Sequence, residues 1–195
     1  DDVPRANLNE SAVVSAALSI ADLEGLDAVT VSSVARKLGV KPASLYSHVR
    51  DRSGLFSAMH RRGLGELSGR VSADIAGRAG KDALVALADA HRNLAHDRPG
   101  MWALLQRPAP TEVVRSSEAE RIASLILAVL RGYSLPDGEL VNGVRFVGAT
   151  INGYLALMHT EAFSNRSESY DASWEATIAA IDRALRSWPR EGTSL

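Results

Sequence analysis

The sequence predicts an all-α protein, and three features of the chain carry that prediction. Apolar residues recur at the three- and four-residue spacing of an amphipathic helix in almost every segment between glycine or proline breakers. No sustained two-residue alternation between tight-turn sequences marks a β-hairpin. The 195 residues, 46% of them hydrophobic, are enough to bury a substantial core. We therefore expect helices packed on helices.

The first two helices are predicted from their capping residues. One helix is expected over Asn9–Glu24, with Asn7 and Glu10 spaced as a capping box, and ends at the glycine that follows. Another is expected to begin after Thr30, a residue type that favours the N-cap position, and to stop at Gly39.

A third and a fourth helix are predicted beyond this glycine turn. Pro42 starts the third helix, because proline is tolerated in a first helical turn, and the helix ends near Arg50. Leu45 and Val49, four residues apart, form its buried side. Asp51 is expected to cap the fourth helix.

The short elements before residue 50 have the layout of a helix-turn-helix, whose last helix is free to enter a DNA major groove. At about 100° per residue, with Leu45 and Val49 facing inward, Ala43 and Ser47 point outward. The flanks of this face carry Ser44, Tyr46 and His48. Because small hydrogen-bonding side chains suit groove entry, Ser44, Ser47 and Lys41 are the candidates for contacts with base edges.

Charge is distributed unevenly along a chain that is almost neutral as a whole. The 22 Lys and Arg residues nearly balance the 23 Asp and Glu residues, for a formal net charge of −1. Between Ala28 and Arg62, however, seven basic residues stand against a single acidic residue, Asp51. The predicted helix-turn-helix is therefore the part of the chain that should attract phosphates.

Three stretches of this region resemble the DNA-binding domain of the TetR family of bacterial transcriptional repressors. They are Gly25–Val31, Val34–Val40 and Leu45–Val49, and the likeness as a whole spans about Asn9–Met59. The resemblance implies an N-terminal domain that binds DNA through a helix-turn-helix and a C-terminal half that binds a ligand and dimerises.

The resemblance also implies roles for individual residues. In this family a threonine that opens the second helix and a tyrosine and a histidine of the recognition helix bind phosphates, which implies that role for Thr30, Tyr46 and His48. Arg52 stands where the family usually has lysine, and an arginine should bind a phosphate as well as a lysine does. Ser32 aligns with a base-reading arginine of the tetracycline repressor, so a different operator is expected. The full predicted DNA-binding set is Thr30, Ser32, Lys41, Pro42, Ala43, Ser44, Tyr46, Ser47, His48 and Arg52.

The chain is predicted to have three parts. We expect a helix-turn-helix DNA-binding domain over residues 1–52, a connecting helix over 53–79, and an all-helical ligand-binding and dimerisation domain over 80–195. In the third part the spacing predicts helices over about 82–96, 101–106, 111–131, 139–163 and 172–188.

The two long helices at the end of the chain predict a homodimer. The helix from Glu139 is apolar on two sides, so one side is expected to face the core and the other a second subunit. Together with the last helix it could form the four-helix interface of a two-fold dimer. The predicted interface residues are Val144, Val147, Ile151, Leu155, Trp174, Ile178, Ile181 and Leu185. The alternative is a fully internal helix in a monomer.

A small-molecule site is predicted in the C-terminal half. Residues 95–105 and 152–163 are also similar to a regulatory-domain subgroup of the same family, although Asn152-Gly153-Tyr154 departs from its usual His-Gly-Phe. The candidate ligand-binding residues are His91, Met101, Trp102, Leu105, Phe146, Thr150, Tyr154, Met158 and His159. Such residues favour an apolar or amphipathic ligand, the alternative being that they are simply core.

Several classes of function are not expected. The chain has no cysteine, and it contains none of the nucleophile-elbow, zinc-protease, P-loop or dinucleotide-binding motifs, so we expect no enzyme, no metal site and no cofactor. No segment approaches the roughly 20 apolar residues of a membrane span, and the polar first ten residues do not resemble a signal peptide. A cytoplasmic protein without a membrane partner is therefore expected.

The sequence as a whole predicts a ligand-responsive transcriptional regulator. We expect a repressor that binds a palindromic double-stranded DNA operator as a homodimer and that a small-molecule effector releases. Two alternatives stay open, a non-sensing architectural DNA binder and a helical protein-interaction module.

Overall fold

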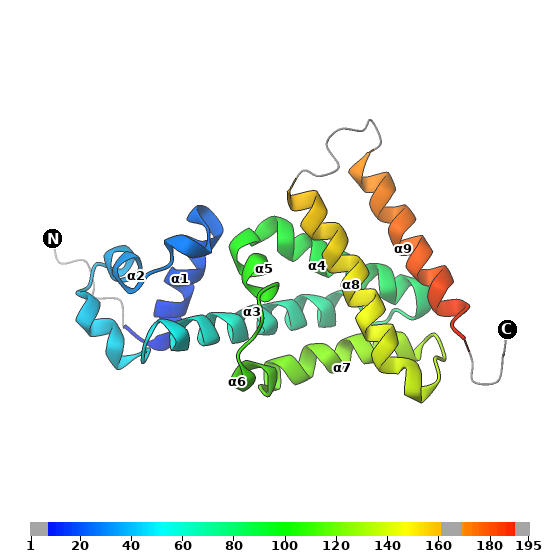
Figure 1. The fold of residues 1–195 in the computed structure, drawn as a ribbon, viewed down its shortest axis with the longest axis horizontal. Coiled ribbons are helices and arrows are strands. Elements are labelled where there is room, and N and C mark those ends of the chain that lie inside the picture. The colour runs from blue at the N-terminus through cyan, green and yellow to red at the C-terminus, as the bar shows by residue number, and fades with distance from the viewer. Residues whose placement is uncertain (1–7, 161–168, 190–195) are drawn as a thin grey trace. The chain divides into compact units, whose positions relative to one another are not determined.

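A computed structural model describes residues 8–160 and 169–189, and these residues form helices without strands, which confirms the all-α prediction (Figure 1). Nine α-helices and three 3₁₀ segments follow one another in this part of the chain. They are α1 (Glu10–Glu24), η1 (Leu26–Ala28), α2 (Val31–Leu38), η2 (Pro42–Ser47), α3 (Arg52–Asp74), α4 (Gly80–Asp97), α5 (Pro99–Leu105), α6 (Thr111–Val114), α7 (Ser117–Arg131), η3 (Asp137–Glu139), α8 (Leu140–His159) and α9 (Tyr170–Arg186).

Short-range hydrogen bonds determine where the first helices begin and end. The side chain of Asn9 accepts a hydrogen bond from the Ala12 N–H at 2.9 Å, so Asn9 is the N-cap of α1. Asn7, the predicted cap, lies outside the described residues. Thr30 caps α2 as predicted, and Gly39 ends α2 in the left-handed conformation at φ 67°.

Two predicted helices differ from those observed. The third is a 3₁₀ segment that ends at Ser47, before the predicted end near Arg50. The helix predicted over 111–131 is divided into α6 and α7, because Ser116 leaves the helix and its hydroxyl accepts a hydrogen bond from the Ala119 N–H at 3.3 Å. In both places a serine side chain bonds to nearby backbone and competes with the regular helix.

The chain packs into two compact units. Unit 1 consists of residues 1–66 and 94–120, and unit 2 of residues 67–93 and 121–195. These units are defined by packing, so their bounds differ from the three-part functional division expected over 1–52, 53–79 and 80–195, which stays a prediction.

Unit 1 is held together by the contact of α5 with α1. Arg98 donates to Asp22 at 2.6 Å and to Glu66 at 2.9 Å, and Asp22 also accepts from the Met101 N–H at 3.0 Å. A Cβ atom on Gly100 would lie 2.1 Å from the backbone carbon of Ala21, so only glycine allows this approach. The helix that follows residue 98 is therefore fixed against α1.

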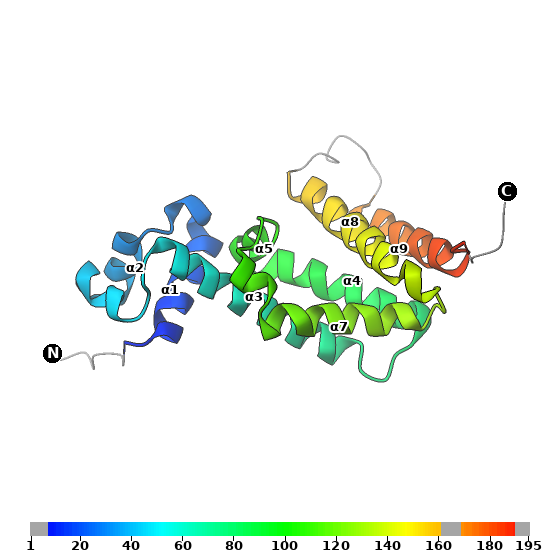
Figure 2. The same ribbon diagram turned by 60° about the horizontal axis from the view of Figure 1, so that its bottom comes forward.

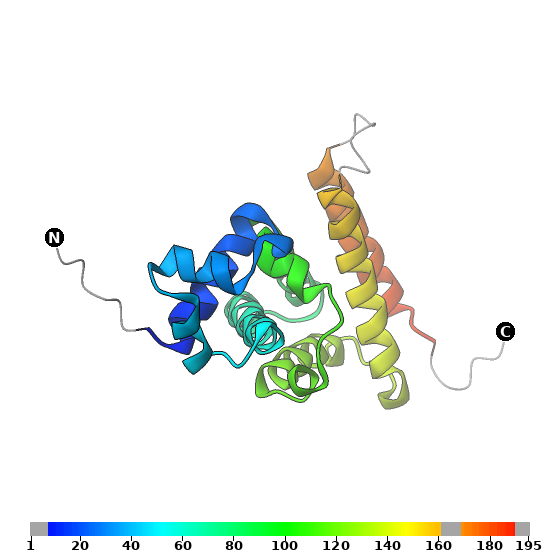
Figure 3. The same ribbon diagram turned by 60° about the vertical axis from the view of Figure 1, so that its left-hand side comes forward.

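In unit 2, α8 and α9 lie side by side (Figures 2 and 3). Seven apolar side chains of these helices lie in the chain's own core, each at most 3% exposed: Val147, Ile151, Leu155, Trp174, Ile178, Ile181 and Leu185. These seven, with half-buried Val144, are the residues predicted for the dimer interface. The single chain already covers these side chains, and their part in a dimer interface stays a prediction.

Candidate nucleic-acid interface

The surface of η2 is organised by its 3₁₀ geometry, in which side chains three residues apart lie in one row. One row has Leu45 at its centre, fully buried against the rest of unit 1. The row of Ala43 and Tyr46 and the row of Ser44 and Ser47 are both exposed. The predicted outward pair, Ala43 and Ser47, is therefore divided between two rows.

The N-terminus of α2 presents Thr30 in a network with Ser33. The Ser33 N–H donates to the Thr30 hydroxyl oxygen at 3.0 Å, and the Thr30 N–H donates to the Ser33 hydroxyl oxygen at 2.9 Å. The Ser33 hydroxyl itself donates to the Ala28 carbonyl at 2.7 Å. Thr30 is thus held at an exposed helix start, where its side chain and the helix N-terminus can face a phosphate.

Arg52 begins α3, directly after the turn that follows η2. Its guanidinium carbon lies 4.7 Å from the centre of the Phe56 ring, which orients the side chain while leaving it exposed. Asp51 accepts from the Gly54 N–H at 2.7 Å, and this hydrogen bond lowers the pKa of the carboxyl group. Asp51 therefore caps α3 as predicted, and it also pairs with Arg50 at 3.3 Å.

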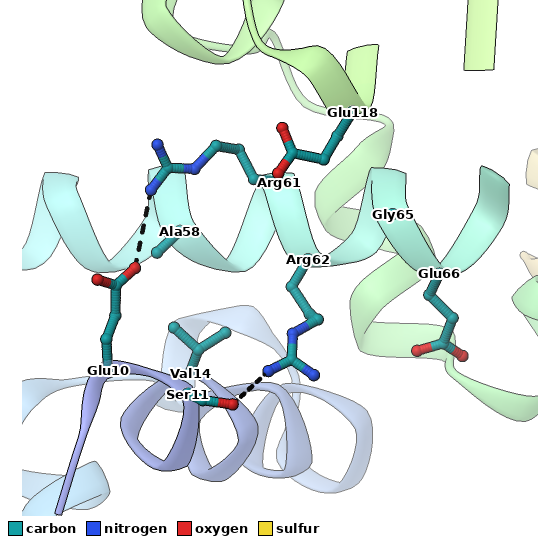
Figure 4. Close-up of a pocket in the computed structure, with 9 residues that line it drawn as sticks. All are labelled: Glu10, Ser11, Val14, Ala58, Arg61, Arg62, Gly65, Glu66 and Glu118. Carbon is teal, nitrogen blue, oxygen red and sulfur yellow. Dashed lines mark hydrogen bonds and ion pairs between the residues drawn. The ribbon is translucent and has the colours of Figure 1, made fainter. Parts of the chain in front are cut away.

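Two of the seven basic residues in the positive segment serve a different purpose. Arg61 lies 3.8 Å from Glu10, and Arg62 donates to the Ser11 hydroxyl at 2.6 Å, so both hold α3 to α1 (Figure 4). The remaining five are exposed: Arg36, Lys37, Lys41, Arg50 and Arg52. The basic surface open to DNA is thus smaller than the sequence count suggested.

Most of the ten predicted DNA-binding residues lie on the surface of unit 1. Nine are exposed, and Tyr46 is 56% exposed although it is aromatic. His48, which follows η2, is half-buried. Their contact with DNA stays a prediction.

Sequence reasoning missed the residues that support this surface. Ser33 stands three positions after Thr30, a spacing typical of a capping box, so a signal for its role was present. The cluster of Asp22, Glu66 and Arg98 joins residues up to 76 positions apart, and no local pattern in the sequence marks it.

The candidate ligand-binding residues do not share one unit. Met101, Trp102 and Leu105 belong to unit 1, where Met101 and Leu105 pack within 3.2 Å of the position a Gly63 Cβ would take. The others belong to unit 2, where each of Phe146, Thr150, Tyr154 and Met158 is partly exposed, His159 is exposed and His91 is buried.

The buried and aromatic members of the unit 2 set pack against their neighbours. The His91 imidazole is bonded to the Leu87 carbonyl at 2.8 Å, and its burial lowers its pKa. The ring of Phe146 lies 5.7 Å from that of Trp188, and the ring of Tyr154 lies 5.3 Å from that of Trp174. These contacts are consistent with residues of the hydrophobic core as well as with residues of a ligand site.

Each unit has a large groove among its described residues. The first, of about 690 Å³, lies between α1, α3 and Glu118 and is lined by the Arg61 and Arg62 contacts (Figure 4). The second, of about 500 Å³, lies between α4 and α9 and is lined by Asp89, Arg92 and Trp174 among others. No predicted ligand-binding residue lines either groove.

None of the helices in residues 8–160 and 169–189 has the length and apolar character needed to span a bilayer. Within the same residues no three histidine or acidic side chains gather as a metal site would require.

The chain matches two protein families, one for each half. Residues 13–59 match the family described as "Bacterial regulatory proteins, tetR family", and residues 84–181 match "Tetracyclin repressor-like, C-terminal domain". The HTH-type transcriptional regulator YobS of Bacillus subtilis is 29% identical over 170 residues, which are 85% of this chain and 86% of YobS. An HTH-type transcriptional regulator of Mycobacterium tuberculosis is 35% identical over 136 residues, which are 69% of this chain and 62% of that protein.

Solved structures share the fold at low sequence identity. A protein from Rhodococcus sp. RHA1 has a TM-score of 0.78 at 19% identity, covering 95% of this chain and all of that one. BioQ bound to its double-stranded DNA operator has a TM-score of 0.64 at 20% identity, covering 93% and 99%. A TetR variant from Acinetobacter baumannii AYE in complex with minocycline has a TM-score of 0.67 at 19% identity, covering 92% and 95%.

Proposed function

Since the chain belongs to the TetR family of transcriptional regulators, with a DNA-binding and a ligand-binding domain, we propose that it is a repressor that binds a palindromic operator as a homodimer and that a small molecule releases. The observation that carries the proposal is the surface of η2, where two rows of small or hydrogen-bonding side chains are exposed beside five exposed basic residues. A cytoplasmic protein that recognises a promoter sequence needs such a surface to bind DNA.

The proposed contacts divide into positioning and reading. Thr30, Tyr46, His48 and Arg52 are assigned to backbone phosphates, which fix the register of the protein on the duplex. Ser44, Ser47 and Lys41 are assigned to base edges, with Ser32, Pro42 and Ala43 beside them. The phosphate contacts are those that the resemblance to the TetR family implies, and the base contacts are proposed for small or basic side chains on the exposed surface of η2.

The proposed dimer uses the side of α8 and α9 that the chain leaves uncovered. Val141, Leu157 and Tyr170 are large apolar side chains that are 56%, 47% and 37% exposed. Ala149 and Gly153 of α8 are exposed beside them and would allow the backbone of a second helix to approach closely. To read a palindrome, the two copies of η2 in the proposed dimer would have to lie about 34 Å apart.

The proposed effector is an apolar or amphipathic small molecule bound in the C-terminal domain. The TetR variant from Acinetobacter baumannii AYE is an example of a structural neighbour in complex with a small molecule, minocycline. The residues proposed to contact the effector remain those predicted from the sequence: His91, Met101, Trp102, Leu105, Phe146, Thr150, Tyr154, Met158 and His159. To release the operator, the effector must bind the released conformation more tightly than the DNA-bound one.

The experiment that tests the proposal is selection of bound DNA from a random duplex pool, with the mass of the protein measured by light scattering in the same buffer. We expect an enriched inverted repeat and a dimer. An architectural binder would enrich no sequence, and a protein-interaction module would retain no DNA; either result would contradict the proposal.

Tyr46 and Ser47 offer a matched pair for separating the two kinds of contact. Tyr46→Phe removes one phosphate hydrogen bond, so it should weaken binding to every duplex by a similar factor of roughly three to ten. Ser47→Ala should change the relative preference among sequences. Binding titrations with the selected operator and its single-base variants measure both effects, and the reverse pattern would contradict the assignment.

A further inference from the structure

Ser47, on the exposed row of η2, has already used its only proton. Its hydroxyl oxygen lies 2.8 Å from the Ser44 carbonyl oxygen. Because a carbonyl oxygen cannot donate, the hydroxyl must be the donor of this hydrogen bond. The proton of Ser47 therefore points back to the helix, and only the lone pairs of the oxygen remain for an outside partner.

An oxygen that can only accept distinguishes among the bases of a major groove. Cytosine offers the N4 amino group and adenine the N6 amino group, both of them donors. Guanine offers N7 and O6 and thymine offers O4, all of them acceptors. Ser47 can therefore bond to cytosine or adenine without losing its bond to Ser44, and it cannot do so with guanine or thymine.

Ser44 differs from Ser47 in this respect while sharing its row. The Ser44 hydroxyl makes no hydrogen bond within residues 8–160 and 169–189, so it can donate as well as accept. Three residues of a 3₁₀ segment rise about 6 Å, nearly twice the spacing of stacked bases, so the two serines face different base pairs. Ser44 is thus a natural control for Ser47.

We propose that Ser47 is a specificity-determining residue that accepts a hydrogen bond from an exocyclic amino group, cytosine N4 or adenine N6, at one position of each operator half-site. The inference rests on the proposed function, because it needs η2 to enter the major groove of a specific operator. It goes beyond that function by stating the polarity of one contact and the bases that satisfy it.

The test removes the amino group from the DNA and the hydroxyl from the protein in turn. In the selected operator, each cytosine is replaced by a pyrimidin-2-one nucleotide and each adenine by a purine nucleotide, which lack the amino group. Dissociation constants are then measured for the wild-type protein and for Ser47→Ala, Ser47→Thr and Ser44→Ala.

At one cytosine or adenine per half-site, removal of the amino group should weaken DNA binding. We expect this loss of affinity to be roughly three- to tenfold larger for the wild-type protein than for Ser47→Ala. The same loss of affinity on removal of the amino group should occur in Ser44→Ala, which keeps the Ser47 hydroxyl, and in Ser47→Thr, which has a hydroxyl at the same position. Because Ser47 is exposed, its replacement should leave the fold intact, as circular dichroism can verify.

Three results would overturn the inference. One is a preference for guanine or thymine that depends on Ser47. Another is an equal loss of DNA affinity in wild-type protein and Ser47→Ala at every amino group that is removed, because Ser47 would then be coupled to none of them. A pool without any enriched motif would overturn the proposed function as well, so the two failures can be told apart.

Discussion

The helix-turn-helix of unit 1 and the long helices of unit 2 differ in how well their exposed faces can be predicted from the sequence. In the helix-turn-helix, the polar side chains predicted to face DNA lie on the surface, and only His48 is half-buried. In α8 and α9, the apolar side chains predicted to face a partner are covered by the chain itself. Short elements with clear caps thus reveal their outer face, whereas long helices that are apolar all round do not.

The reason lies in the range of the interactions. Thr30 begins α2 and Gly39 ends it through contacts between residues at most five positions apart, and such contacts can be predicted from a sequence. Helix α8 has apolar residues on two sides, and which side packs inward depends on where α9 lies. Periodicity alone gives no answer to that question.

The largest effect is expected where unit 1 depends on one close approach. Gly100→Ala would place a Cβ atom 2.1 Å from the Ala21 backbone, which cannot move aside as a side chain could, so unfolding free energy should fall by about 3 kcal/mol or more. Gly69→Ala is the control, since nothing lies within 4 Å of its Cβ position in helix α3. That change should stabilise by up to about 1 kcal/mol. Urea denaturation measures both, and equal effects would contradict the close packing of α5 on α1.

A smaller effect is expected from the arginine ion pairs of the two units. Arg98→Met leaves the carboxylates of Asp22 and Glu66, which are 14% and 26% exposed, without their shared partner, at a cost of about 2 kcal/mol. Arg186→Met removes a pair whose arginine is 60% exposed, and Asp182 keeps its hydrogen bond from the Tyr133 hydroxyl, so the cost should be less than about 1 kcal/mol. A larger loss for Arg186→Met in urea denaturation would reverse the comparison.

The smallest effect is expected from one buried histidine in each unit. Burial lowers the pKa of His60 in unit 1 and of His91 in unit 2. Below the ordinary pKa of about 6.5 the unfolded chain binds more protons, so stability is complete above that pH and falls as the pH decreases. Each group contributes a slope of at most about 1.4 kcal/mol per pH unit.

His60→Gln and His91→Gln should each make the pH dependence shallower between pH 6.5 and 5, and the double variant more so. Urea denaturation across this range measures the slope. An unchanged slope in the double variant would show that neither imidazole is buried in the neutral form.

The sequence therefore predicted the fold class and the local features of the recognition region, including the caps at Thr30 and Asp51. It placed Ala43 and Ser47 on one face because it assumed an α-helix, whereas the 3₁₀ segment separates them. It could not reveal that Arg61 and Arg62 hold α1, or that Arg98 joins Asp22, because these partners meet only in the folded chain.

The central claim is that the exposed rows of η2 read a particular DNA sequence, and the most direct test is a paired titration. The protein is titrated with the selected operator and with a scrambled duplex of equal length, at one fixed salt concentration. The account predicts an affinity for the operator roughly 10³-fold higher or more. Affinities within tenfold of each other would contradict it.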